Sequence, residues 1–238
     1  MKWKVRLTGD ERGLEELSES FSEDPEVFED ENNFFLWSSN FEDLEEVSEV
    51  KDIAERIVLN IRNLGLKDSL RTEYLHTAHI HEIKDDGTEH VTVIAEVEPV
   101  KVRANPVSIT TTDQTGNKEV YHPADRTYEL TKLALEDEKV QELVGLLDKG
   151  NNWVNLYRIY EFIQAHISGD ENIVERGWWS SNEKDRFKRT ANSRDAIGDN
   201  ARHGQERIPA PENTMIHSDA KGLVDNLIDN WLEHRRQL

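Results

Sequence analysis

The densest group of polar and ionisable side chains in this sequence lies between Arg189 and Gly204. Apolar residues are too sparse there to form one face of an amphipathic helix, and the residue types are those that cap helices or bind ligands. An arginine guanidinium can hold a phosphate or a carboxylate through two parallel hydrogen bonds, and a histidine can carry a proton near neutral pH. The segment therefore supplies the candidate catalytic residues Arg194, Arg202 and His203 and the candidate binding residues Asn192, Asp195, Asp199 and Asn200.

The same segment also has a structural interpretation, in which its arginines hold the fold together. Arg194 or Arg202 would then pair with nearby aspartates or with carbonyl groups at helix C-termini, and His203 would be an ordinary hydrogen-bonding residue. Polar connections between the helices of a bundle are commonly structural. The two interpretations differ in an observable way, because a catalytic pair must lie in an open groove within reach of one phosphate.

Two adjacent aromatic residues, Trp178 and Trp179, follow Arg176 and precede a run of small polar residues. Their rings could stack on a base or on another flat ring of a ligand. Such a pair more often fills the junction between helices. We therefore treat both tryptophans as candidate binding residues and keep packing as the alternative.

Three histidines, His79, His81 and His90, flank the dipeptide Asp86-Gly87. Asp-Gly favours a two-residue hairpin loop, which would pair Asp85 with Thr88. In that register the three histidines share one face of the hairpin, and the other face carries Ala78, Ile80, Val91, Val93, Ala95 and Val97. Three imidazoles could hold zinc or nickel, but the pattern dictates no fourth ligand and a solvent-facing polar surface explains it as well. We therefore predict no metal site.

The charge of the chain is strongly acidic and unevenly distributed. The 238 residues carry a net charge of −20, and residues 1–60 contain 18 acidic and 6 basic side chains. Residues 176–207 reverse this balance, with 8 basic and 5 acidic side chains. Because an acidic protein repels nucleic-acid backbones at long range, RNA or another phosphate-containing ligand would need a local basic patch, which the sequence places at residues 176–207.

Several functional classes are excluded or disfavoured. The chain has no cysteine, so it has no disulfide, no thiolate zinc site and no cysteine nucleophile. It contains no phosphate-binding glycine loop, no Gly-x-Ser-x-Gly elbow and no dinucleotide fingerprint, and we predict no cofactor. No apolar run approaches the length needed to cross a bilayer, and the first residues turn polar before a signal-peptide core could form. The sequence therefore predicts a cytoplasmic protein without membrane association.

Residues 1–122 predict an α+β sandwich domain. Trp3, Val5 and Leu7 alternate with basic residues, as in a strand with one buried face. We expect a short helix over 11–21, two short strands on either side of residues 29–33, a long helix from Asn40 to about Gly65, and the hairpin between 70 and 104. This order favours an antiparallel or mixed sheet with helices on one side.

Residues 123–238 predict an all-α bundle of about four helices. Residues 105–122 are rich in turn formers, and Pro123 stands where a helix can begin. Apolar residues then recur at helical spacing up to Gly150, again over 153–167, and from residue 218 to the end, with a shorter helix over 182–190.

The C-terminal half resembles the HEPN superfamily in the order of its features. A predicted bundle contains an apolar helix with tyrosines, and an arginine and then His203-Gly204 follow that helix before the last helix of the bundle. Many HEPN proteins are metal-independent RNases. Their sequence motif is an arginine followed, after four to six intervening residues, by a histidine. A polar residue often comes directly after the arginine, as Asp195 follows Arg194. Eight residues separate Arg194 from His203 here, and Arg202 is adjacent to the histidine. The resemblance implies that His203 acts on the attacking hydroxyl or holds the phosphate, that an arginine offsets the phosphoryl charge, and that a homodimer forms the groove. The same segment is also similar to the C-terminal tails of uncharacterised prokaryotic proteins.

These observations lead us to expect an accessory protein of bacterial or archaeal type. It would bind a phosphate-containing ligand, RNA or an acidic protein partner through the Arg/His site of its HEPN-like bundle. A metal-independent RNase using the same residues is the alternative from the enzyme class, and a purely structural interaction module is the third.

Overall fold

The computed structural model describes residues 2–94, 109–112, 118–121, 123–167, 172–202 and 209–238. The chain divides into two compact units, residues 1–136 and 137–238. The first unit combines an antiparallel sheet with helices, whereas the described part of the second contains helices only. The chain is therefore α+β, as predicted.

A five-stranded sheet forms the centre of the first unit, in the order β2-β3-β1-β4-β5 with every neighbouring pair antiparallel. Its strands are β1 (Trp3–Thr8), β2 (Glu26–Asp30), β3 (Asn33–Trp37), β4 (His76–Ile83) and β5 (Glu89–Val93). Val5 lies opposite both Leu36 and Ile80, and all three side chains are buried. Alternation along β1 thus gives the sheet the single apolar face predicted from the sequence.

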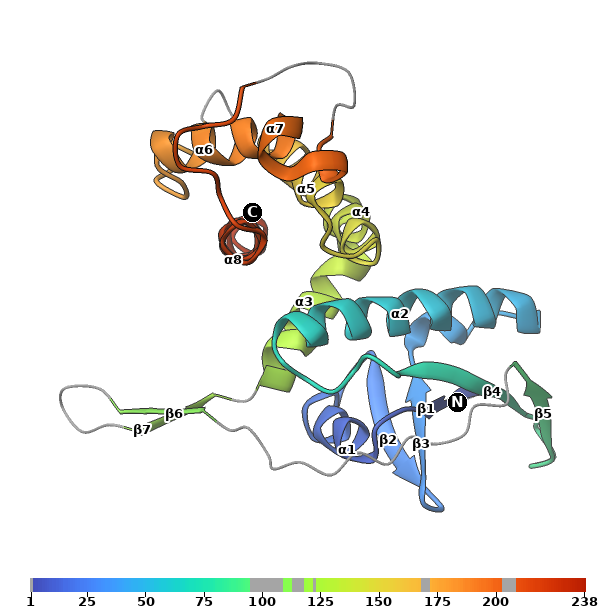
Figure 1. Ribbon diagram of the computed structural model, residues 1–238. Coiled ribbons are helices and arrows are strands. Elements are labelled where there is room, and N and C mark those ends of the chain that lie inside the picture. The colour runs from blue at the N-terminus through green and yellow to red at the C-terminus, as the bar shows by residue number, and fades with distance from the viewer. Residues whose placement is uncertain (1, 95–108, 113–117, 122, 168–171, 203–208) are drawn as a thin grey trace. The chain divides into compact units, whose positions relative to one another are not determined.

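Three helices cover that face, α1 (Glu11–Ser20), α2 (Val47–Lys67) and α3 (Pro123–Glu136) (Figure 1). Five of the eight buried residues of α2 recur at helical spacing on the side that faces the core: Val50, Ala54, Ile57, Ile61 and Leu64. The rings of Phe21, after α1, and Tyr128 of α3 meet edge to face with centroids 5.1 Å apart. A further two-stranded sheet in this unit pairs β6 (Ile109–Thr112) with β7 (Lys118–Tyr121).

The long helix begins later than predicted. Asn40, the expected first cap, lies in a short 3-10 helix, η1 (Ser39–Phe41), and the hydroxyl of Ser38 accepts its backbone N–H. Phe41 is fully buried, so the chain turns into the core before α2 starts at Val47. The prediction that Asn40 caps the long helix is therefore wrong: Ser38 is the N-cap of η1, and Glu46, which precedes α2, makes no side-chain capping hydrogen bond.

The predicted register of the β4–β5 hairpin is wrong by one residue. Lys84, rather than Asp85, pairs with Thr88: the N–H of Lys84 donates to the carbonyl of Thr88, and the N–H of Gly87 donates to the carbonyl of Lys84, each over 2.9 Å. Gly87 has φ +82°, which fits a three-residue loop that ends in a left-handed glycine. The extra loop residue moves every side chain of β5 to the other face.

The corrected register separates the three histidines. His79 and His81 lie opposite Val93 and Val91, whereas His90 lies opposite Glu82 on the other face. Val91 and Val93, which were expected to join Ala78 and Ile80, are instead about half exposed, at 50% and 57%. Ala95 and Val97 lie outside the described residues.

The second unit consists of α4 (Glu138–Leu147), α5 (Trp153–Ala165), α6 (Ser181–Asn192), the short α7 (Arg194–Ile197) and η2 (Gly198–Asn200), and α8 (His217–Arg236). Its core contains a cluster of rings contributed by α5, by α6 and by the chain before α6. In this cluster Tyr160 stacks on Trp179 at 5.4 Å and Tyr157 stacks on Phe187 at 5.9 Å. Burial raises the pKa of the Tyr160 hydroxyl to about 12.

The helix expected between Pro123 and Gly150 is two helices, because the chain is extended at Asp137. The carboxylate of Asp137 accepts the N–H groups of Lys139 and Val140 and so caps α4. Before the break, Arg126 of α3 donates to the carboxylate of Asp68, which follows α2. This contact helps to hold α3 in the first unit, so the structural division follows Glu136, whereas the predicted boundary lay between residues 122 and 123.

Candidate functional site

The polar segment predicted as the functional site spans α6, α7 and η2. A capping box starts α6, in which the Ser180 hydroxyl accepts the N–H of Glu183 and the Glu183 carboxylate accepts the N–H of Ser180. Two hydrogen bonds donated to the Glu183 carboxylate, first by the Ser180 N–H and second by the Ser180 hydroxyl, hold the pKa of Glu183 below its usual range. One face of α6 is buried through Phe187, Thr190 and Ala191, so the remaining faces present the polar residues.

Arg194 and Asp199 pair with each other at the surface. The Arg194 guanidinium donates to the carboxylate of Asp199 over 2.5 Å, with side chains 59% and 89% exposed. Asp195 and Asn200 are also exposed. A pair this open to solvent contributes little to stability, and its arginine can exchange one anion for another at small cost.

Arg202 is held differently, by two residues of α5. Its guanidinium lies 2.9 Å from the carboxylate of Glu161 and 4.5 Å from the centre of the Tyr157 ring. Its backbone N–H donates to the carbonyl of Ala191. These three contacts fit the structural interpretation for Arg202. His203, the predicted proton carrier, lies outside the described residues.

Asn192 is a buried helix-end residue rather than an exposed ligand. Its side-chain amide donates to the carbonyl of Lys188 over 2.7 Å. Its Oδ1 atom and the neighbouring Ser193 hydroxyl are buried and have no hydrogen-bond partner among the described residues. Buried polar atoms left in this state cost about 1–3 kcal/mol each. The junction between α6 and α7 is therefore a polar site within an apolar core.

Of the two adjacent tryptophans, Trp179 packs in the core and Trp178 lies partly at the surface. Trp179 is 2% exposed, stacks on Tyr160, and donates its indole N–H to the carbonyl of Leu223. Trp178 is partly exposed, with the guanidinium of Arg176 5.4 Å from its ring centre and the ring of His234 6.0 Å away. Trp179 is thus a core residue, and a ligand could reach only Trp178.

Two lysines of α6 were missed by the sequence reasoning. Lys184 and Lys188 are four residues apart, so they share one side of the helix, and both are partly exposed. Within the described part of the chain, neither amine has a hydrogen-bonding or ion-pair partner. Arg186 and Arg189, by contrast, donate to carbonyls of residues 210–214. The spacing of the lysines was visible in the sequence, but their lack of carboxylate partners was not.

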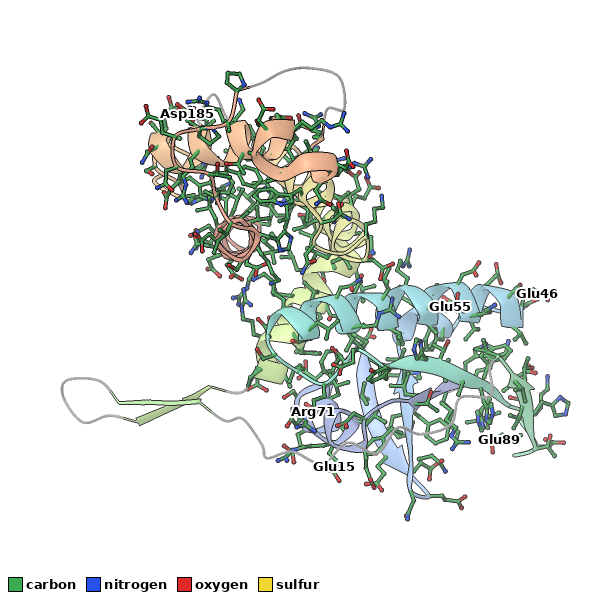
Figure 2. The ribbon with its side chains drawn as sticks, in the orientation of Figure 1. Glu15, Glu46, Glu55, Arg71, Glu89 and Asp185 are labelled. Atoms are coloured by element: carbon green, nitrogen blue, oxygen red, sulfur yellow. The ribbon has the colours of Figure 1, made fainter. Side chains whose placement is uncertain are left out.

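His79 and His81 lie on a sheet face with aromatic and charged neighbours instead of further metal ligands. The Nδ1 of His81 lies 2.8 Å from the carboxylate of Glu89, and the ring of Phe35 meets the His81 ring edge to face. Figure 2 labels Glu89 on β5. The hydrogen bond with His81, assisted by Lys4, holds the pKa of Glu89 below its usual range against the opposing effect of burial. Among the described residues, no group of three histidine or carboxylate side chains is placed to hold a metal ion.

Comparisons with protein-family models, with curated proteins and with solved structures found no match to this chain. The HEPN resemblance and the homodimer it implies stay predictions. None of the helices in the described ranges has both the length and the apolar character needed to span a membrane.

Proposed function

We propose that this protein is a non-catalytic binding protein. Its second unit, residues 137–238 and called the helical unit below, binds a phosphate-bearing ligand through the exposed cations of residues 176–207. The observation that carries the proposal is the pair of lysines on α6, Lys184 and Lys188, for which the described residues supply no carboxylate. Arg194 adds an exposed guanidinium, and the Asp199 carboxylate that pairs with it is itself in solvent. In a chain of net charge −20, such a local excess of cations favours an anionic partner.

A binding role is better supported than an RNase role by what the arginines contact. Arg202 is held by Glu161 and Tyr157, so its guanidinium is not free to meet a phosphate. An RNase would need an arginine and a histidine within reach of one phosphate in an open groove. The RNase therefore remains the second candidate, favoured by the polar residues at the α6–α7 junction and by the HEPN resemblance.

The test is the binding of a labelled 20-nucleotide RNA and of inorganic polyphosphate, measured by fluorescence anisotropy and by competition at low salt. Reversing both lysines, Lys184→Glu with Lys188→Glu, should weaken binding by roughly tenfold or more, and the wild-type affinity should fall steeply with salt. The matched control is Lys139→Glu with Lys149→Glu, which makes the same charge change on and just after α4. Equal weakening in both double variants, or no binding by the wild type, would overturn the proposal.

The same RNA distinguishes the enzyme from the binding protein. Incubation of a mixed RNA pool with the wild type in the presence of a chelator should leave the RNA intact. Cleavage that disappears in both His203→Ala and Arg194→Ala would establish a metal-independent RNase in place of a binding protein.

A further inference from the structure

A cleft of about 550 Å³ lies in the first unit, beside α2 and the start of β4. The residues of α2 that line it are Glu55, Arg56, Val58, Leu59 and Arg62. His76 and Thr77 of β4 and Ile94, just after β5, complete the described lining. Its volume lies within the range of about 300–1,000 Å³ that is typical of small-molecule sites.

The spacing along α2 explains why one side of the helix lines a cleft. Ile57, Ile61 and Leu64 point into the core, whereas residues 55, 58, 59 and 62 recur at three- and four-residue steps on a neighbouring face. Glu55 and Arg56 are exposed at the helix surface, and Figure 2 labels Glu55 on α2. The opposite wall is fixed, because the N–H of Ile94 donates to the carbonyl of Ala78 over 2.7 Å.

The cleft has an excess of positive charge. Its single described carboxylate, Glu55, has the amine of Lys51 3.7 Å away, one helical turn earlier. Arg56 is exposed, and no carboxylate or carbonyl among the described residues pairs with it. Arg62 supplies the second guanidinium of the lining. Its backbone carbonyl accepts a hydrogen bond from the hydroxyl of Thr72, and this bond fixes the backbone at Arg62. His76 adds an exposed imidazole with no partner in the described ranges.

Apart from Thr77, the remaining described lining is apolar. Val58 is 3% exposed, Leu59 is partly exposed, and Ile94 is partly buried against the core of the first unit. A ligand that fills the cleft therefore needs an apolar body as well as an anionic group. Guanidinium groups recognise a carboxylate through two parallel hydrogen bonds, and such pairs are strengthened next to apolar surface.

We propose that this cleft is a binding site for a small organic carboxylate with an apolar body, with Arg56 and Arg62 holding the carboxylate and Val58, Leu59 and Ile94 contacting the body. The surrounding charge favours a small ligand over a polyanion. Residues 1–60 carry a net charge of −12, so a nucleic acid extending beyond the cleft would be repelled. This site is independent of the lysines on α6.

The experiment is calorimetric titration of the full chain with 2-naphthoate, with octanoate as an aliphatic carboxylate, and with 2-naphthamide, which keeps the ring system and removes the charge. We expect dissociation constants between roughly 10 µM and 1 mM for a carboxylate of this size. The amide should bind at least about tenfold more weakly. Equal binding of acid and amide would overturn the role of the arginines.

Three variants locate the site, and a fourth is the control. Arg56→Gln and Arg62→Gln should each weaken naphthoate binding by roughly tenfold, and Leu59→Trp should abolish it by filling the cleft. Lys132→Gln removes a partly exposed cation from α3 of the same unit and should leave binding unchanged. Circular dichroism confirms that each variant is folded. Naphthoate binding that survives all three cleft variants, or that the wild type lacks, would overturn the proposal.

Discussion

The arginines of the helical unit and the arginine at the mouth of the α2 cleft differ in what they already contact. Arg186, Arg189, Arg202 and Arg235 each donate to a carbonyl or a carboxylate of their own unit. Arg56 has no such partner among the described residues. Both regions are polar in sequence, but these four arginines of the helical unit stabilise the fold, whereas Arg56 remains available for a ligand.

This difference shows why residue type is a poor guide to a binding site. The segment between Arg189 and Gly204 concentrates arginine, aspartate and asparagine, yet Arg189 and Arg202 are held by Ala210 and Glu161, which lie outside it. A cation indicates a ligand only when its own fold leaves it without an anion, and that property depends on residues distant in the chain. We test this difference between the two regions by replacing single side chains in each and measuring the loss in the free energy of unfolding.

The largest loss should come from Trp179, the member of the tryptophan pair that packs in the core. Trp179→Ala should destabilise the helical unit by about 3–5 kcal/mol, because it removes a fully buried ring stacked on Tyr160. Trp178→Ala should cost less than half as much. Urea denaturation followed by far-ultraviolet circular dichroism measures both. Equal losses would show that Trp178 is also a core residue and not available to a ligand.

A second prediction concerns Asp137, which caps α4 and accepts hydrogen bonds from Arg235. Burial opposes ionisation of this carboxyl, but the Arg235 side chain and the N–H groups of Lys139 and Val140 outweigh it and hold the Asp137 pKa below its usual range. Asp137→Ala should therefore cost about 1–2 kcal/mol at neutral pH. Glu142→Ala, on the exposed side of α4, is the control and should cost less than about 0.5 kcal/mol.

The pH dependence of that loss follows from the direction of the shift. The unfolded carboxyl has a pKa of about 3.9, so ionised Asp137 stabilises the folded unit fully above that value. The contribution disappears as the pH falls through the lower, folded-state pKa. Denaturation midpoints of the wild type and Asp137→Ala should therefore converge on acidification below about pH 4. A constant difference down to pH 2 would mean that the charge of Asp137 contributes nothing.

The sequence predicted the elements better than their pairings, for a physical reason. The strand at Trp3–Thr8 and the helices α1, α5, α6 and α8 follow from apolar periodicity, which is a local property. The β4–β5 register depended on whether Asp86-Gly87 closed a loop of two residues or of three. Both loops suit Asp-Gly, and only the pairing of Lys84 with Thr88 distinguishes them.

The site was harder to predict than the fold because its contacts join distant residues. Glu161 and Tyr157, which hold Arg202, lie more than 40 positions before it in a different helix. Arg56 and His76 meet at one cleft from a helix and a strand that no motif connects. Neither pairing leaves a signal in the spacing of a single sequence.

Arg202 and Arg56 provide the direct comparison. Arg202→Met removes an ion pair with Glu161 and the cationic contact with the Tyr157 ring, and keeps an apolar chain of similar length. Because the side chains are partly exposed, we expect a loss of about 1 kcal/mol in the helical unit. Chemical denaturation at moderate salt measures it, and Glu161→Gln should remove a part of the same energy. A neutral Arg202→Met would mean that this arginine, too, is available to a ligand.

The smallest expected effect is that of Arg56→Met, and it decides the comparison. Since no described residue pairs with Arg56, its removal should change the stability of the first unit by less than about 0.5 kcal/mol in the absence of ligand. Naphthoate should then raise the melting temperature of the wild type and leave the variant unchanged, because a ligand stabilises only the protein that binds it. A loss above about 1 kcal/mol without ligand would show that Arg56 contributes to the fold as Arg202 does. Its charge would then be no evidence for a binding site, and the apolar lining alone would have to account for any naphthoate bound.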